Sequence, residues 1–126
     1  MPPRDPAAGV LTPLELQIMQ VLWEENAATV SEVQARLGSD LAYTTVQTML
    51  NVLWRKKKAR RELDGRAFVY RPAVTREKAM GTALEDLVTR MFGGSEEALL
   101  MALVDTRKVT PEALARAARL LEERET

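Results

Sequence analysis

The sequence predicts a mainly α-helical fold with one small β-hairpin. Two capping boxes, Thr12–Glu15 and Thr29–Glu32, each mark the start of a helix. From about Tyr43, apolar and polar side chains fall on opposite faces of a third helix. The dipeptide Asp64-Gly65 then separates two short runs with strand character, as in a hairpin with a two-residue type I′ turn. These elements, in this order, predict a winged helix-turn-helix domain.

Composition narrows the classes of function. The 126 residues suit one domain with room for a small second unit. The absence of cysteine and histidine excludes disulfides, thiolate metal sites and the commonest catalytic base. Adjacent carboxylates in the predicted helices diverge, so we expect no enzyme, no cofactor and no metal site. No stretch approaches the ~18 apolar residues of a membrane span, and no signal peptide is recognisable. We therefore expect a cytoplasmic protein without a membrane partner.

The ends of the first three helices follow from local signals. The first helix should end near Glu25 and be buried on more than one side, and the second should close at Gly38 in a left-handed conformation. The start of the third is less clearly marked. Ala42 is a poor N-cap, and either Asp40 or Thr44 could serve instead.

The third helix, expected over about residues 43–57, has the composition of a DNA recognition helix. Its apolar face contains Val46, Met49, Leu50 and Leu53. Its polar face contains Thr44, Thr48, Asn51 and Arg55. An ordinary solvated face is the alternative, but such faces are usually filled with Glu and Lys, whereas Thr and Asn are weak helix formers. In the major groove Asn can bind adenine bidentately, Thr can contact a base edge or a thymine methyl, and Arg can bind guanine or phosphate.

The helix end and the hairpin, or wing, over about residues 60–71 are strongly basic. From Arg55 to Arg71 there are eight basic and two acidic residues, although the formal net charge of the whole chain is zero. A helix C-terminus favours some cations through the macrodipole, but this density exceeds that need and predicts a phosphate-binding surface. The predicted phosphate-binding residues are Arg55, Lys56, Lys57, Lys58, Arg60, Arg61 and Arg66.

The aromatic residues are candidates for stacking on single strands, but beside apolar helical neighbours such residues are far more often core. We assign Trp23, Phe68 and Tyr70 to the core. Trp54 lies on the flank of the recognition helix. For this residue, packing under the wing is the alternative to stacking on a single strand.

The chain divides into a disordered tail (1–10), a winged-helix domain (11–73) and a C-terminal domain of three helices (74–126). Thr75, Ser95 and Thr110 are the expected caps of these helices. Three helices in about fifty residues have too few internal neighbours for a good core, so a second copy of the chain should cover their apolar faces. The predicted dimerisation residues are Met80, Leu84, Leu87, Met91, Leu99, Leu100, Leu103, Leu114 and Leu121.

Four segments carry a family resemblance: LTPLELQIMQVLW, LAYTTVQTML, GRAFVYRP and MFGGS. They resemble the penicillinase and methicillin-resistance repressors, antibiotic-resistance regulators whose family also includes copper-responsive repressors. The resemblance extends from residue 11 to about residue 123. It implies a homodimer whose winged helices bind a palindromic operator and whose C-terminal helices pair the chains. It also implies DNA contacts for Thr44, Thr45, Thr48 and Arg55–Lys57, with the wing at Asp64–Arg66 on the DNA backbone.

The chain departs from the family pattern at several positions. Members often have glycine where this chain has Lys57 and a basic residue at Val52, which predicts a less sharply turned helix exit and one phosphate contact fewer. Members that control β-lactamase are inactivated by cleavage of an Asn-Phe bond, which aligns with Ala102-Leu103 here. Copper-responsive members use a C-terminal cysteine-metal motif that this chain lacks. A protease therefore stays an open partner in induction.

We predict a homodimeric transcriptional repressor of a promoter with an inverted repeat, with half-sites about one helical turn of DNA, or a multiple, apart. Two alternatives remain open. One is a winged-helix regulator that responds to a small molecule between the dimer lobes. The other is a winged-helix protein-interaction module without specific DNA binding.

Overall fold

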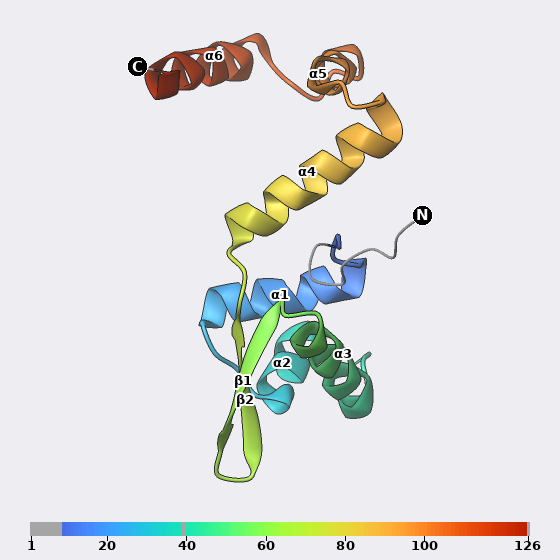
Figure 1. The fold of residues 1–126 in the computed structure, drawn as a ribbon, viewed down its shortest axis with the longest axis vertical. Coiled ribbons are helices and arrows are strands. Elements are labelled where there is room, and N and C mark those ends of the chain that lie inside the picture. Colours follow the sequence, from blue (N-terminus) through green and yellow to red (C-terminus); the bar gives the residue numbers. More distant parts are fainter. Residues whose placement is uncertain (1–8, 39, 126) are drawn as a thin grey trace. The chain divides into compact units, whose positions relative to one another are not determined.

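The structure is a computed structural model that describes residues 9–38 and 40–125 (Figure 1). The elements in order are α1 (Pro13–Glu25), α2 (Val30–Leu37), α3 (Tyr43–Arg55), β1 (Ala59–Asp64), β2 (Ala67–Pro72), α4 (Arg76–Phe92), α5 (Glu96–Asp105) and α6 (Pro111–Glu125). The chain forms two compact units, one ending at Leu84 and one beginning at Glu85, and each is described by itself. Most of the predicted tail, residues 1–8, lies outside the described residues.

Both predicted capping boxes are present. At the start of α1, the Thr12 hydroxyl accepts a hydrogen bond from the Glu15 backbone amide (3.2 Å), and the Glu15 carboxylate accepts one from the Thr12 amide (2.8 Å). Thr29 and Glu32 make the same reciprocal pair at the start of α2. Gly38 ends α2 with φ 98° and ψ 174°, so the positive φ that favours glycine is present, but the predicted left-handed helical conformation is not.

The core of the first unit lies between α1, α2, α3 and the hairpin. Helix α1 packs against α2, α3 and β2, and α3 packs against β1 (Figure 1). The core residues are Ile18, Met19, Val21, Leu22, Ala28, Val30, Val33, Val46, Leu50, Leu53, Ala59 and Tyr70. On α3, Val46, Leu50 and Leu53 are fully buried and Met49 is partly buried against them. The predicted apolar face of this helix is therefore confirmed.

The hairpin register differs from the prediction by one residue. Asp64 pairs with Ala67, so the loop consists of Gly65 and Arg66 and not of Asp64 and Gly65. A type I′ turn needs positive φ at both loop residues. Gly65 has φ 64°, but Arg66 is not among the described residues with positive φ, so the type I′ assignment is wrong. The Tyr70 backbone also exchanges two hydrogen bonds with Ala28, at 2.8 and 2.9 Å, which ties β2 to the helices.

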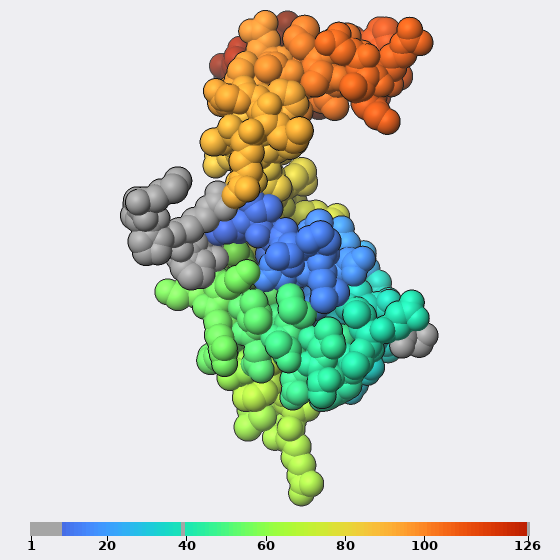
Figure 2. Space-filling view, turned by 90° about the vertical axis from the view of Figure 1, so that its right-hand side faces the viewer, coloured from blue at the N-terminus to red at the C-terminus, as the bar shows by residue number. Residues whose placement is uncertain are grey.

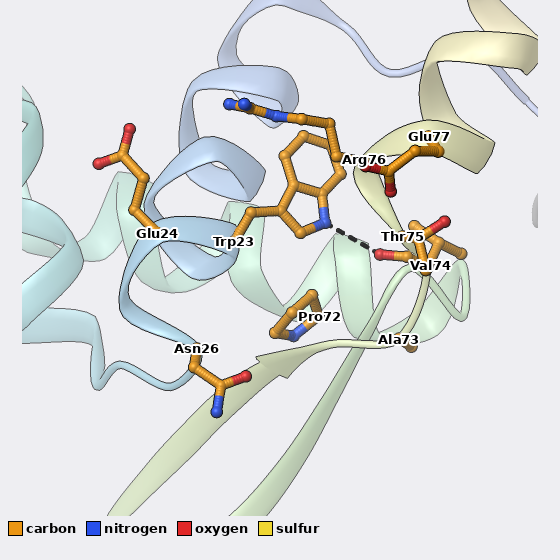
Figure 3. A pocket seen from close by; sticks show the side chains of 9 residues that line it. All are labelled: Trp23, Glu24, Asn26, Pro72, Ala73, Val74, Thr75, Arg76 and Glu77. Carbon is orange, nitrogen blue, oxygen red and sulfur yellow. Dashed lines mark hydrogen bonds between the residues drawn. The ribbon is translucent and has the colours of Figure 1, made fainter.

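The segment that leaves the hairpin is anchored by Trp23. The Trp23 indole N–H donates to the Val74 carbonyl (2.9 Å), and the guanidinium of Arg76 lies 5.7 Å from the ring centroid (Figure 3). Trp23 is partly buried against the core. Trp23, near the end of α1, thus contacts the segment between β2 and α4.

The last three helices, α4, α5 and α6, have their predicted caps but bury few side chains. The hydroxyls of Ser95 and Thr110 accept hydrogen bonds from the amides of residues 98 and 113, at 3.1 and 3.0 Å, and Thr75 does the same at the start of α4 (3.0 Å). Among residues 85–125, Val88 is the one buried hydrophobic side chain. Within the described part of the chain, no side chain of α5 or α6 is buried. None of the described helices is long and apolar enough to cross a membrane.

Candidate nucleic-acid interface

The polar face of α3 is exposed as its sequence predicts. Thr44, Thr45 and Thr48 are exposed, and Asn51 is half-buried one turn further on. Ala42 occupies the N-cap position without a side-chain hydrogen bond, so neither proposed substitute caps the helix. The side chain of Gln34 in α2 donates to the Leu41 carbonyl (3.0 Å). This hydrogen bond links α2 to the residues just before α3. Sequence reasoning missed this contact.

The exit of α3 turns sharply at Lys57. This residue has φ 62°, its amide donates to the Trp54 carbonyl (3.1 Å), and the Lys58 amide donates to the Leu53 carbonyl (2.9 Å). These two bonds form a Schellman motif, in which the left-handed position is usually glycine. The prediction of a less sharply turned exit is therefore wrong. Lys57 adopts the left-handed conformation that glycine usually takes at this position. Because lysine has a Cβ, this conformation costs more free energy for Lys57 than it would for glycine.

Lys56 has a partner within the protein that the sequence analysis did not anticipate. Its ammonium lies 2.9 Å from Glu15, whose side chain is 1% exposed at the start of α1. Burial acts to raise the pKa of the Glu15 carboxyl, but hydrogen bonds from the Thr12 amide and from Lys56 outweigh it, so the pKa lies below its usual value of 4.5. This ion pair joins the start of α1 to the end of α3. Lys56 therefore contributes to the fold, and its role in phosphate binding stays a prediction.

The burial of Lys58 corrects its predicted role in phosphate binding. This lysine is 7% exposed, and its backbone is engaged on both sides, because its amide closes α3 and its carbonyl accepts from the Ala73 amide (2.8 Å). A residue this buried cannot present its ammonium to a DNA phosphate. The prediction treated every cation of the run as solvated, which is wrong here because the chain turns inward to begin β1.

Arg61 of β1 contacts α3. Its guanidinium carbon lies 3.6 Å from the ring centroid of Trp54 and 4.2 Å from that of Phe68, and it donates a hydrogen bond to the Asn51 side-chain oxygen. Phe68 is 39% exposed, so its assignment to the core is wrong, whereas Tyr70 is buried as predicted. Trp54 packs against a residue of the wing, which agrees with the alternative raised for it.

A cleft of about 330 Å³ lies between α2, α3 and the hairpin. It is lined by Thr29, Val30, Ser31, Tyr43, Gln47, Asn51, Arg61, Arg66, Ala67, Phe68 and Tyr70. Arg55, Lys57, Arg60 and Arg66 are exposed around α3 and on the wing. The wing extends as a narrow projection beyond the packed helices (Figure 2). A polar helix face, a cleft and exposed cations thus belong to one unit, as a surface that binds a polyanion requires.

Comparison with known proteins identifies the family. Residues 11–123 match the family described as Penicillinase repressor. The chain belongs to this family. It is a winged-helix transcriptional repressor that binds DNA, and it is not an enzyme.

The repressor is 24% identical to the penicillinase repressor of Bacillus licheniformis over 111 residues, which cover 86% of this chain and 87% of that protein. It is 34% identical to the transcriptional regulator BlaI of Mycobacterium tuberculosis over 96 residues, which cover 73% of this chain and 70% of that protein. A solution structure of monomeric Bacillus licheniformis BlaI in complex with the blaP half-operator is 30% identical and covers 56% of this chain and 89% of that chain, with a TM-score of 0.49.

Some residues of the repressor's candidate interface escaped prediction. Thr29 and Ser31 at the start of α2 line the cleft, as do Tyr43 and Gln47 of α3. The spacing of Tyr43, Gln47 and Asn51 at successive fourth positions places them on one helical stripe, beside the predicted polar face. That stripe was the available signal for the two α3 residues. The contribution of α2 depends on tertiary packing and has no local signal.

Proposed function

We propose that the repressor acts in the cytoplasm as a homodimer on an operator with an inverted repeat. The observation that carries this proposal is the exposed face of α3, where three short polar side chains lie in one unit with exposed cations. We assign base contacts to Thr44, Thr45, Thr48 and Asn51. We assign phosphate contacts to Arg55, Lys57, Arg60 and Arg66, each of which is exposed.

The exposed apolar residues of α4, α5 and α6 support the homodimer. Of the predicted dimerisation residues, Leu87 and Leu99 are half-buried in the single chain, and the others are exposed: Met80, Leu84, Met91, Leu100, Leu103, Leu114 and Leu121. Extensive exposed apolar surface usually marks an interface. A second copy supplies the same kind of surface, and a two-fold dimer presents two recognition helices to an inverted repeat, about one turn of DNA or a multiple apart.

Binding of the full chain to duplex DNA tests the proposal. The probe is a fluorescent duplex selected from a randomised library, titrated by anisotropy over a range of salt concentrations. We expect sequence preference, together with affinity that falls as salt rises because bound cations release counterions. Binding that is independent of both sequence and salt would contradict the proposal and favour a protein-interaction module.

Two variants separate base contacts from phosphate contacts. Thr48→Ala should relax the preference for particular bases, whereas Arg66→Ala should weaken binding to all duplexes alike and reduce the salt slope by about one. Similar profiles for both variants would contradict the division of roles between helix and wing.

The route of induction adds one structural constraint. The bond Ala102-Leu103, which aligns with the cleaved bond of β-lactamase-controlling relatives, lies inside α5. Proteolysis favours exposed, irregular segments. If a protease is the partner that releases the repressor at this bond, α5 must open locally first, and cleavage should therefore be slower in the assembled dimer than in a dissociated chain.

A ligand-responsive regulator is the second candidate, and one observation favours it. A mainly apolar groove of about 320 Å³ lies between α1 and the start of α4, with Trp23, Arg76 and Met80 among its lining residues. Its size lies at the lower end of the range for small-molecule sites. Dye-binding with 1-anilinonaphthalene-8-sulfonate tests whether it accepts an anionic aromatic compound. Competition between the dye and operator DNA would favour this candidate.

A further inference from the structure

The contacts of Arg61 link the wing to the recognition helix. In the hairpin register Arg61 pairs with Tyr70, so Phe68 is its diagonal neighbour on the adjacent strand, within reach of a long side chain. From this position the guanidinium contacts the rings of Trp54 and Phe68, at 3.6 and 4.2 Å from their centroids, and donates to Asn51. A planar cation over two rings and an amide oxygen is restrained in position and orientation.

This contact determines which end of the Asn51 amide faces the wing. Arginine has hydrogen-bond donors and no acceptor, so Asn51 must direct its oxygen, and not its nitrogen, toward Arg61. Asn51 makes no other side-chain hydrogen bond within residues 9–38 and 40–125. Its NH₂ group is therefore the end of the amide available to a partner outside the protein.

We propose that Arg61 is a positioning residue that orients Asn51 as a hydrogen-bond donor, so that the pair favours guanine over adenine at one base pair of each half-site. The inference rests on the proposed DNA binding by α3. It changes the expectation for Asn51, because asparagine is usually associated with adenine.

The preference for guanine follows from the donors and acceptors of the major groove. Bidentate binding of adenine requires the amide oxygen to accept from the adenine N6 amino group while the amide nitrogen donates to N7. Here the oxygen already accepts from a cation, and the neighbouring guanidinium N–H groups disfavour another donor. Guanine presents two acceptors, N7 and O6, to the same groove. An Asn51 amide that presents only its NH₂ group as donor is therefore complementary to guanine.

Arg60 is the matched control. It precedes Arg61 on β1, and because successive side chains of a strand point to opposite faces, it lies on the other face of the hairpin. Arg60 is exposed and is opposite Arg71 in the register, whereas Arg61 is half-buried. A phosphate-binding arginine and a positioning arginine are thus adjacent in the sequence, and the same substitution can be made in each.

The test uses the full chain with duplexes selected from a randomised library, and anisotropy titrations of the selected duplex at several salt concentrations. Each guanine is then replaced by adenine in turn. For the wild type, one such replacement per half-site should lower affinity about tenfold or more through the Asn51 contact. Asn51→Ala should abolish that discrimination. Arg61→Lys keeps the charge but not the planar guanidinium, so it should reduce the discrimination severalfold while the salt slope is unchanged.

The controls separate positioning from phosphate binding and from folding. Arg60→Lys should leave the guanine preference intact. Phe68→Leu removes one ring contact of Arg61 and should partly relax the preference, and thermal unfolding by circular dichroism verifies that each variant is folded. The inference is overturned if Arg61→Lys retains the full preference, if adenine is selected at the Asn51 position, or if Arg61→Gln weakens all duplexes equally with a reduced salt slope. Failure of the wild type to select any sequence would instead overturn the proposed function together with the inference.

Discussion

The two units of the chain contain similar helices but differ in what those helices bury. Helix α3 has three fully buried side chains, from Val46 to Leu53, whereas no residue of α5 or α6 is buried. Both units have apolar residues at helical spacing and side-chain caps. Apolar periodicity therefore shows which face of a helix is to be buried, but not which other element or chain buries it. In the first unit the other elements of the same unit bury these faces, and we propose that a second copy of the chain buries those of the second unit.

The largest expected effect is in the core of the first unit. Leu50→Ala should destabilise it by about 2–5 kcal/mol, because truncating a fully buried leucine loses apolar burial and leaves a cavity. Urea unfolding monitored at two protein concentrations measures this loss. Leu121→Ala changes an exposed position on α6, in the second unit. It should leave the unfolding free energy of the first unit within about 0.5 kcal/mol of the wild-type value. Equal losses in both variants would contradict the contrast between the units.

The next effect concerns association through the second unit. Met91 is 72% exposed at the end of α4. If a second chain covers it, Met91→Glu buries an unpaired charge in the interface and should lower affinity for a two-half-site operator about 10²-fold, since linked binding of two modules is lost. Thr89→Glu adds the same charge at an exposed position of the same helix and is the control. Anisotropy titrations that do not distinguish these variants would argue against this interface.

A smaller effect is expected at the ion pair between α1 and α3. Glu15→Gln preserves the capping geometry but removes the charge opposite Lys56, which should cost about 1–2 kcal/mol, a figure reduced because Lys56 is partly solvated. Glu32→Gln alters the equivalent position of the second capping box, where the carboxylate is exposed, and should cost less than about 0.5 kcal/mol. Thermal unfolding at neutral pH compares the two. Equal losses would mean that Lys56 adds nothing to Glu15.

The same pair predicts a pH dependence. The pKa of Glu15 in the folded chain lies below its usual value of 4.5, so its ionised form stabilises the fold. The contribution is complete above pH 4.5 and is lost as the pH falls through the folded-state pKa. Wild type should therefore lose stability more steeply than Glu15→Gln in acid titrations of the unfolding free energy. Parallel curves would show that another carboxylate dominates.

The smallest effect is a gain. Lys57→Gly should stabilise the first unit by about 1 kcal/mol, because glycine adopts the left-handed conformation at the α3 exit without the cost of a side chain. Lys57→Ala removes the same charge without relieving that conformation, so it should not be stabilising. A higher melting temperature for the alanine variant than for the glycine variant would contradict the structural assignment of this turn.

Predictions from sequence succeeded where the determining partners are close along the chain. Thr12 and Glu15 are three positions apart, and the alternating faces of α3 follow from helical geometry alone, so both could be recognised in advance. Glu15 and Lys56 are separated by 41 positions, and nothing in either segment indicates that they meet. The same limitation applies to the burial of Lys58, which depends on where β1 begins.

The hairpin shows a subtler limit. Asp64-Gly65 is a strong turn signal, yet Asp64 remains paired with Ala67 and the loop moves to Gly65 and Arg66. A one-residue change in register alters which side chains oppose each other across the strands. The contact of Arg61 with Phe68 and Trp54 depends on that register, so the positioning of Asn51 could be recognised only from the folded hairpin.

Sedimentation equilibrium of the full chain, without DNA and over a series of dilutions, tests directly whether a second copy covers the helices beyond residue 85. We predict twice the mass of the chain at micromolar concentrations, with Met91→Glu shifted toward the single-chain mass and Thr89→Glu unchanged. A single-chain mass at every concentration would contradict the homodimer and leave the exposed apolar faces of α4, α5 and α6 to a different partner.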